Sequence, residues 1–143
     1  MERLTKIGFR GVGEWKITSG EAIAPCIVEL MNEKNMLYAF ISGDTVLYVG
    51  QTTGPLKKRM DQYKNAHKDT QTTNFKNKQR IFKLLSDGKQ IEIYAFPDSG
   101  LHYMDNFHLN LAAGLEQSII NLIPREFPTR EGGGESREPP CCP

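Results

Sequence analysis

The stretch that decides the fold is YAFISGDTVLYVG, residues 38–50. Two apolar and aromatic runs, residues 36–41 and 46–49, flank the sequence SGDT, whose residues favour tight turns. This pattern predicts a β-hairpin. With a plain two-residue turn, Tyr38 and Tyr48 would lie on opposite faces of it, because side chains alternate along a strand. They share a face only if the hairpin has a three- or five-residue loop, or a bulge, near residues 43–45.

Two helices and a strand are predicted after the hairpin. Pro55 suits a first helical position, and Leu56, Met60 and Tyr63 recur on one helical face, which indicates a helix over residues 55–66. A second helix is expected to begin after Thr72 or Thr73 and to end at residue 85 or 86, before Asp87-Gly88. QIEIYAF, residues 90–96, alternates like a half-buried strand, and a last helix is expected from about residue 109 to 122.

The sequence before the hairpin is less regular. Residues 14–17 are consistent with a short strand, and EAIAPCIVELM, residues 21–31, with a helix that begins at or just before Pro25. The whole pattern predicts an α/β (α+β) fold with a small central antiparallel sheet of three strands, flanked by helices. Residues 1–35 would be an N-terminal extension packed on the core, and residues 36–124 the main domain. Residues 125–143, rich in glycine, proline and charge, would be a disordered tail.

Composition restricts the class of protein. The chain has 143 residues, of which 38% are hydrophobic and 24% charged, as in a soluble globular domain. No apolar run approaches the roughly 20 residues that span a bilayer, and the N-terminus lacks the apolar core of a signal peptide. Cys26 is isolated and the other two cysteines are adjacent at residues 141–142, so no zinc or disulfide pattern is present. These features predict an intracellular protein without a membrane partner.

Positive charge is concentrated in one part of the chain. Residues 57–89 contain 10 of the 18 Lys and Arg residues and only three acidic residues, although the whole chain has a net charge of +1. Such a stretch can be a solvated surface of no special function. It can also be the electrostatic footprint of a protein that binds a polyanion, most simply nucleic acid.

Three side chains in the predicted helices have functional and structural interpretations. Arg59 and Tyr63 are four residues apart and share a helical face. Taken singly, Arg59 could be one more exposed cation, and Tyr63 could be a core aromatic. Glu116 has apolar neighbours at the positions three and four residues away on both sides. Glutamate is rarely buried without a partner, so Glu116 either reaches water at the edge of the apolar stripe or is held by a cation.

The ordered set of motifs resembles the GIY-YIG endonuclease superfamily. The matching segments are MLY at 36–38, YVG at 48–50, LKKRMDQY at 56–63 and LEQSII at 115–120. Residues 47–63 are especially similar to the nuclease domain of bacterial excision-repair incision subunits, and the chain also resembles small restriction-type nucleases of this superfamily. The resemblance implies a small antiparallel sheet flanked by helices and a metal-dependent phosphodiester hydrolase that acts on DNA.

The resemblance also assigns roles to residues. It implies that Tyr38 and Tyr48 contact the scissile phosphate and the attacking water, one of them as general base, and that Tyr63 positions the nucleophile or relays a proton. It implies that Arg59 stabilises the charge of the transition state and that Glu116 binds the cofactor, Mg²⁺ or Mn²⁺. A tyrosine has a pKa of about 10 and is a poor base at neutral pH, so we expect Arg59 and the metal to lower it.

DNA is the expected partner. The residues expected to contact it are Lys57, Lys58, Asn74, Lys76, Asn77, Lys78 and Arg80. A homodimer is one way in which such a small nuclease could cut both strands, in restriction, mobility or repair. The family's asparagine after the glutamate has no counterpart in PREFPTRE, residues 124–131. This departure favours an alternative, a non-catalytic DNA-binding module that keeps the nuclease fold.

Overall fold

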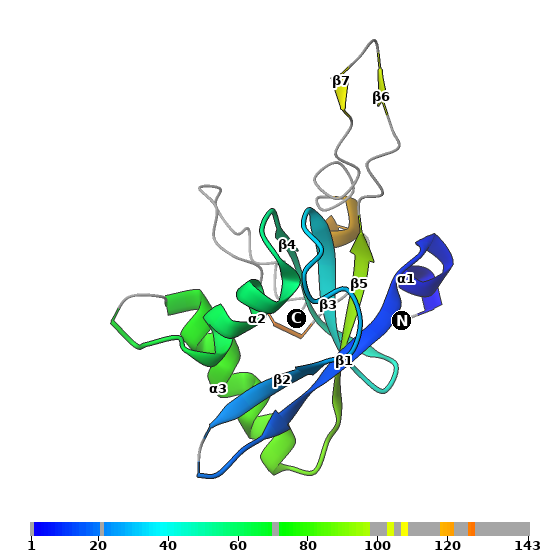
Figure 1. The fold of residues 1–143 in the computed structure, drawn as a ribbon. Helices are drawn as coiled ribbons and strands as arrows, with labels where there is room; N and C mark the ends of the chain where they lie inside the picture. The colour runs from blue at the N-terminus through cyan, green and yellow to red at the C-terminus, as the bar shows by residue number, and fades with distance from the viewer. Residues whose placement is uncertain are drawn as a thin grey trace, which may run out of the picture.

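The core of the protein is one five-stranded antiparallel sheet (Figure 1). The computed structural model describes residues 2–20, 22–69, 72–97, 103–104, 107–108, 118–121 and 126–127. The strands run in the order β2-β1-β5-β3-β4. Their bounds are β1 Arg10–Ile17, β2 Ile23–Ile27, β3 Met36–Ser42, β4 Thr45–Thr52 and β5 Ile91–Pro97. The predicted α+β class is confirmed, but the expectation of three strands is wrong.

The two additional strands come from the first 35 residues. β1 pairs with β5 and with β2, so Trp15 lies opposite Ile91 on one side and Pro25 on the other. The helix expected at Pro25 is therefore wrong, since a short apolar run does not distinguish a helix from a strand by spacing. Proline, which has no N–H to donate, is tolerated here because β2 is an edge strand.

Both faces of the sheet are covered. The helices are α1 Glu2–Ile7, α2 Leu56–Lys64 and α3 Thr72–Ser86, and Figure 1 shows α2 and α3 on one side of the sheet and α1 on the other. The side chains of β3 alternate between the two resulting cores. Tyr38 and Phe40 pack with residues of α2 and α3, whereas Leu37 and Ala39 pack with Leu4 of α1.

The helices α2 and α3 and the strand β5 agree with the predicted ranges to within two residues. Only residues 118–121 of the expected last helix are described, and they are helical. Two short strands, β6 Tyr103–Met104 and β7 Phe107–His108, form a separate pair.

Two residues of the expected tail pack against the domain. The N–H groups of Glu126 and Phe127 donate to the carbonyls of Val46 and Leu47, and the Phe127 side chain is buried. The rest of residues 125–143 lies outside the described residues.

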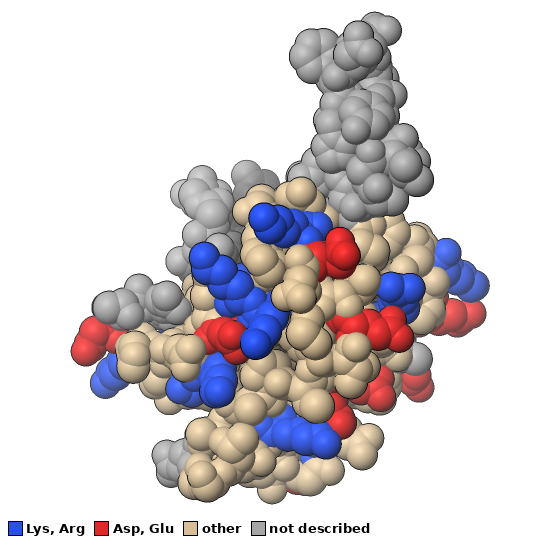
Figure 2. Space-filling view, viewed as in Figure 1, with Lys and Arg blue, Asp and Glu red and all other residues tan. Residues whose placement is uncertain are grey.

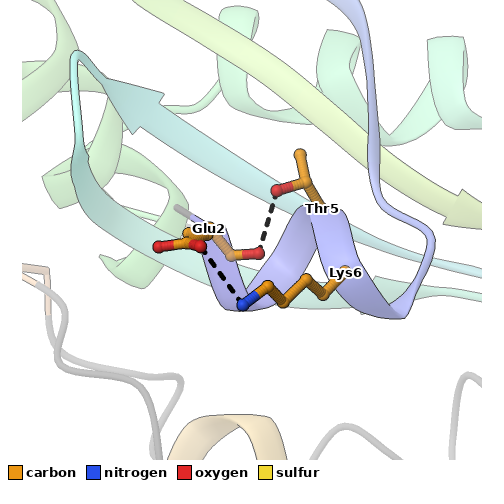
Figure 3. Close-up of polar contacts among 3 residues, drawn as sticks. All are labelled: Glu2, Thr5 and Lys6. Atoms are coloured by element: carbon orange, nitrogen blue, oxygen red, sulfur yellow. Dashed lines mark hydrogen bonds and ion pairs between the residues drawn. The ribbon is translucent and has the colours of Figure 1, made fainter.

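In the short helix α1, surface contacts contribute less to stability than burial does. Lys6 Nζ lies 3.1 Å from Glu2 Oε1 one turn away, and Thr5 Oγ1 donates to the Glu2 carbonyl at 2.9 Å (Figure 3). Such an exposed ion pair contributes little stability, about 0.3–0.5 kcal/mol. The helix is held mainly by Leu4, which is fully buried. Among the described residues, no helix has the length and apolar character needed to cross a membrane.

Candidate functional site

A bulge in the β3–β4 hairpin brings two tyrosines to the same face. Ser42 pairs with Thr45 across a two-residue turn, where Gly43 has a φ of +60°. The register then shifts, because Ile41 pairs with Val46 but Phe40 pairs with Tyr48, which leaves Leu47 as the extra residue. The Tyr38 and Tyr48 rings consequently lie on one face, with centroids 6.3 Å apart. Of the predicted alternatives, an odd-numbered loop or a bulge, the hairpin has the bulge, at Leu47 instead of near residues 43–45.

Helix α2 adds Arg59 and Tyr63 to this face. The Tyr38 and Tyr63 hydroxyls are 2.7 Å apart, and each also accepts a hydrogen bond of 3.0 Å from Arg59, from Nε and NH2 respectively. The Tyr63 ring lies 6.3 Å from the Tyr48 ring and contacts Trp15 edge-on, so β1 supports the site from behind. The tertiary structure thus joins four of the five residues expected to be catalytic.

Burial controls the ionisation of the phenols. It raises the pKa of Tyr38 to about 12, even though the Arg59 cation and its hydrogen bond act in the opposite direction. Burial also raises the pKa of Tyr63 well above its ordinary value, and the neighbouring phenols Tyr38 and Tyr48 raise it further. Arg59 by itself therefore does not bring the pKa of Tyr38 or Tyr63 into the range of a general base, and the expected lowering by Arg59 together with the metal stays a prediction. Both are neutral at pH 7.

This burial predicts a loss of stability at alkaline pH. The folded-state pKa of Tyr38, about 12, lies above its ordinary value of 10.0, so its contribution is complete below pH 10 and is lost as the pH rises towards 12. Two pKa units correspond to about 3 kcal/mol. Urea denaturation, followed by the fluorescence of the single Trp15, should show a larger loss between about pH 9 and about pH 11.5 in the wild type than in Tyr38→Phe. Equal losses in the two proteins would contradict the buried, neutral state of Tyr38.

A polar pocket of 290 Å³ lies beside the cluster. Its lining residues are Gln51, Thr52, Thr53, Gly54, Pro55, Lys58, Arg59 and Gln62. Arg59 alone belongs to both the pocket and the tyrosine cluster, since Tyr38, Tyr48 and Tyr63 are buried behind it. An anion that enters the pocket would therefore meet the guanidinium of Arg59 and the ammonium of Lys58 before it met any phenol.

Two of the expected DNA contacts have another environment. Asn74 is buried and its Oδ1 accepts a hydrogen bond of 3.3 Å from Arg59 NH2. Asn77 is fully buried and its Oδ1 accepts from Arg80 at 3.1 Å. Neither amide is available to contact DNA in this structure, because both point into the protein from α3. Asn74 instead belongs to the Arg59 site.

The basic side chains expected to contact DNA are more accessible. Lys57, Lys58 and Lys76 are exposed, and Lys78 and Arg80 are half-buried. Figure 2 shows Lys and Arg side chains over the region of α2, with fewer acidic side chains among them. Arg80 is partly used inside the protein, because its guanidinium also lies 5.6 Å from the centroid of the Phe127 ring.

Glu116, the expected metal ligand, lies outside the described residues. Within the described part of the chain, no group of three or more His, Cys, Asp or Glu residues could hold a metal ion.

Sequence reasoning missed Gln62, whose Oε1 accepts a hydrogen bond of 2.8 Å from Arg59 NH1. The spacing of three residues on a helix was the available signal, because such pairs are neighbours on the helix surface. The contact of Asn74 with Arg59 had no such signal, since α2 and α3 meet only through tertiary packing.

Comparison with known proteins identifies solved structures that share the fold of this chain. No family model matches the sequence, and no curated protein matches it. Among solved structures, the chain is similar to a glutamate-to-alanine mutant of bacteriophage T4 EndoII, with a TM-score of 0.71 and 21% identity over 90% of this chain and 97% of that chain. It is also similar to the restriction endonuclease HPY188I in complex with product DNA, with a TM-score of 0.57 and 18% identity over 85% and 79% of the two chains. At such identities the likeness establishes a shared fold.

Proposed function

We propose that this chain is a DNA endonuclease of the GIY-YIG type, which hydrolyses phosphodiester bonds. The observation that carries the proposal is that the hydroxyls of Tyr38 and Tyr63 both accept hydrogen bonds from the guanidinium of Arg59, which also lines a polar pocket. The shared fold with T4 EndoII and a restriction endonuclease supports it, as does the order of the sequence motifs.

Arg59 has the central role in this proposal. Hydrolysis forms a bond from a water oxygen to phosphorus and breaks the bond to the leaving oxygen, while negative charge grows on the other phosphate oxygens. The attacking water gives up a proton to solvent, and the leaving oxygen takes one up. A fixed guanidinium beside that charge stabilises the transition state without further reorganisation. Its orientation is set by the buried oxygens of Tyr38, Tyr63 and Asn74, which engage Nε and NH2.

The phenols act as neutral groups. Because the pKa of Tyr38 is raised to about 12 and that of Tyr63 is also raised, both phenols are neutral at pH 7, where they orient Arg59 and can donate a proton in a hydrogen bond. The ring of Tyr48 packs beside the rings of Tyr38 and Tyr63. Mg²⁺ or Mn²⁺ held by Glu116 would supply positive charge at the phosphate and a bound water of lowered pKa.

DNA would lie along the basic surface near the pocket. Lys57, Lys58, Lys76, Lys78 and Arg80 are the proposed phosphate contacts, and such contacts make binding depend steeply on salt. A homodimer would present two sites and could cut both strands of a duplex, which is the arrangement that a restriction role would use.

A non-catalytic DNA-binding module is the second candidate. It is favoured by the burial of Tyr38 and Tyr63, which keeps both phenols from solvent, and by the lack of an asparagine in residues 124–131. Binding with a steep salt dependence and no cleavage would identify this alternative.

Nicking of supercoiled plasmid separates the two functions. We expect cleavage with Mg²⁺ and none with EDTA. The variant Glu116→Ala should nick on the order of a thousandfold more slowly, which is the effect of losing several kcal/mol of charge stabilisation. Glu92→Ala, a change at an exposed glutamate on β5, is the matched control and should nick at the wild-type rate. Cleavage by Glu116→Ala at the wild-type rate would refute the metal role.

A further inference from the structure

The hydrogen bonds of Arg59 leave only one of its nitrogens for a ligand. A guanidinium has five N–H groups. Nε donates to Tyr38, and NH2 donates to both Tyr63 and Asn74, so these two nitrogens have no N–H left. NH1 donates one N–H to Gln62, and its other N–H has no acceptor among the described residues.

The four acceptors differ in how easily they can move. The oxygens of Tyr38, Tyr63 and Asn74 belong to buried side chains, whose displacement would disrupt the core. Gln62 is exposed on α2 and lines the pocket. Its side chain can turn into solvent, where water replaces the lost hydrogen bond. NH1 is thus the part of Arg59 whose partner can be exchanged.

The first two N–H groups of α2 are already used within the protein. The N–H groups of Leu56 and Lys57, at the start of α2, donate to the carbonyls of Glu33 and Met31. These two groups are therefore unavailable to an anion, although a helix N-terminus often binds one. Lys58 and Arg59 remain as the cations that face the pocket.

We propose that Gln62 occupies the place of a phosphate oxygen on Arg59 and is displaced by the substrate. The DNA phosphate enters the pocket, and its oxygens accept both N–H groups of NH1, while Nε and NH2 keep their buried partners. A hydrogen bond between two charged groups is stronger than one from a cation to a neutral amide, so phosphate wins the exchange. The identity of the ligand as DNA rests on the proposed function, whereas the exchange at NH1 rests on the contacts of Arg59.

The variants Gln62→Glu and Gln51→Glu test this exchange. Both place a carboxylate in the same pocket, but Gln62 bonds to Arg59 whereas Gln51, on β4, does not. A carboxylate at position 62 would hold NH1 as an ion pair. We expect Gln62→Glu to raise the Kd for a short DNA duplex roughly tenfold more than Gln51→Glu does. The factor corresponds to the stronger hydrogen bond that Arg59 NH1 makes to a carboxylate than to the neutral amide of Gln62. Binding is measured by fluorescence anisotropy in EDTA, so that no cleavage occurs.

Steady-state kinetics and the alanine variant of Gln62 complete the test. With Mg²⁺, Gln62→Glu should raise KM by the same factor and leave kcat within roughly twofold, because saturating DNA displaces the carboxylate. Gln62→Ala should bind at least as tightly as the wild type. Equal effects of the two glutamate variants, or weaker binding by Gln62→Ala, would overturn the exchange. A wild-type protein that neither binds nor nicks DNA would refute the proposed function instead.

Discussion

Replacing Gly50 by alanine is expected to destabilise the protein by about 3 kcal/mol or more and to disassemble the site. A Cβ at position 50 would lie 2.5 Å from Tyr38 Oη, 2.6 Å from Tyr38 Cζ and 2.9 Å from Tyr48 Cε1. Both rings are buried, so they cannot move away without disturbing the core. Gly50 pairs with Tyr38 across the hairpin, and the missing side chain is what lets the phenol lie over the neighbouring strand.

Gly54→Ala is the matched control for this prediction. A Cβ at Gly54 meets nothing within 4 Å, and this glycine is only a few residues further along the chain. Urea denaturation followed by Trp15 fluorescence should give a near wild-type midpoint for Gly54→Ala and a much lower one for Gly50→Ala. Equal midpoints in the two variants would show that the rings can yield to the extra methyl group.

The second large effect is expected from Arg59. Its loss should lower the rate of plasmid nicking by about 10²–10³, as the removal of one fixed donor to a developing oxyanion does elsewhere. Arg59→Ala would also leave the buried oxygens of Tyr38, Tyr63 and Asn74 without their donor, and each such loss costs about 1–3 kcal/mol. We expect the alanine variant to lose both activity and stability.

Arg59→Lys separates these two losses. Lysine keeps the charge and can satisfy part of the buried set, but it cannot engage all four acceptors in the planar geometry of a guanidinium. The lysine variant should be closer to the wild type in stability than Arg59→Ala and still nick at least about tenfold more slowly than the wild type. Lys58→Ala, at the adjacent exposed cation, should weaken DNA binding but retain kcat. A kcat in Arg59→Lys equal to that of the wild type would exclude a role for the fork-shaped guanidinium.

Local sequence signals were sufficient for about half of the fold. The β3–β4 hairpin, α2, α3 and β5 have clear apolar periods and end at proline, glycine or polar turn residues, so their ranges could be predicted. A bulge or an odd-numbered loop could also be predicted from the shared site that the family resemblance implies, because two tyrosines ten residues apart cannot share a face of a regular hairpin with a two-residue turn.

The first 35 residues could not be assigned in the same way. β2 carries Pro25 and a pattern of five residues that fits a short helix equally well. Its strand geometry comes from pairing with β1, which itself pairs with β5 about 80 residues later. Non-local pairing of this kind leaves no period within the strand itself.

The sequence alone determined which residue types would meet: phenols from one hairpin and a guanidinium with a third phenol from the next helix. The tertiary structure decided the protonation state of the phenols and the hydrogen-bond partners of the guanidinium. Burial of Tyr38 and Tyr63 in the core raises the pKa of both phenols, because a low-dielectric interior disfavours the phenolate more than Arg59 favours it. Packing of α3 on α2 also made Asn74 a partner of Arg59, whereas the partner of NH1 is Gln62, a residue that lines the pocket, since hydrogen bonds between separate elements depend on their positions in space.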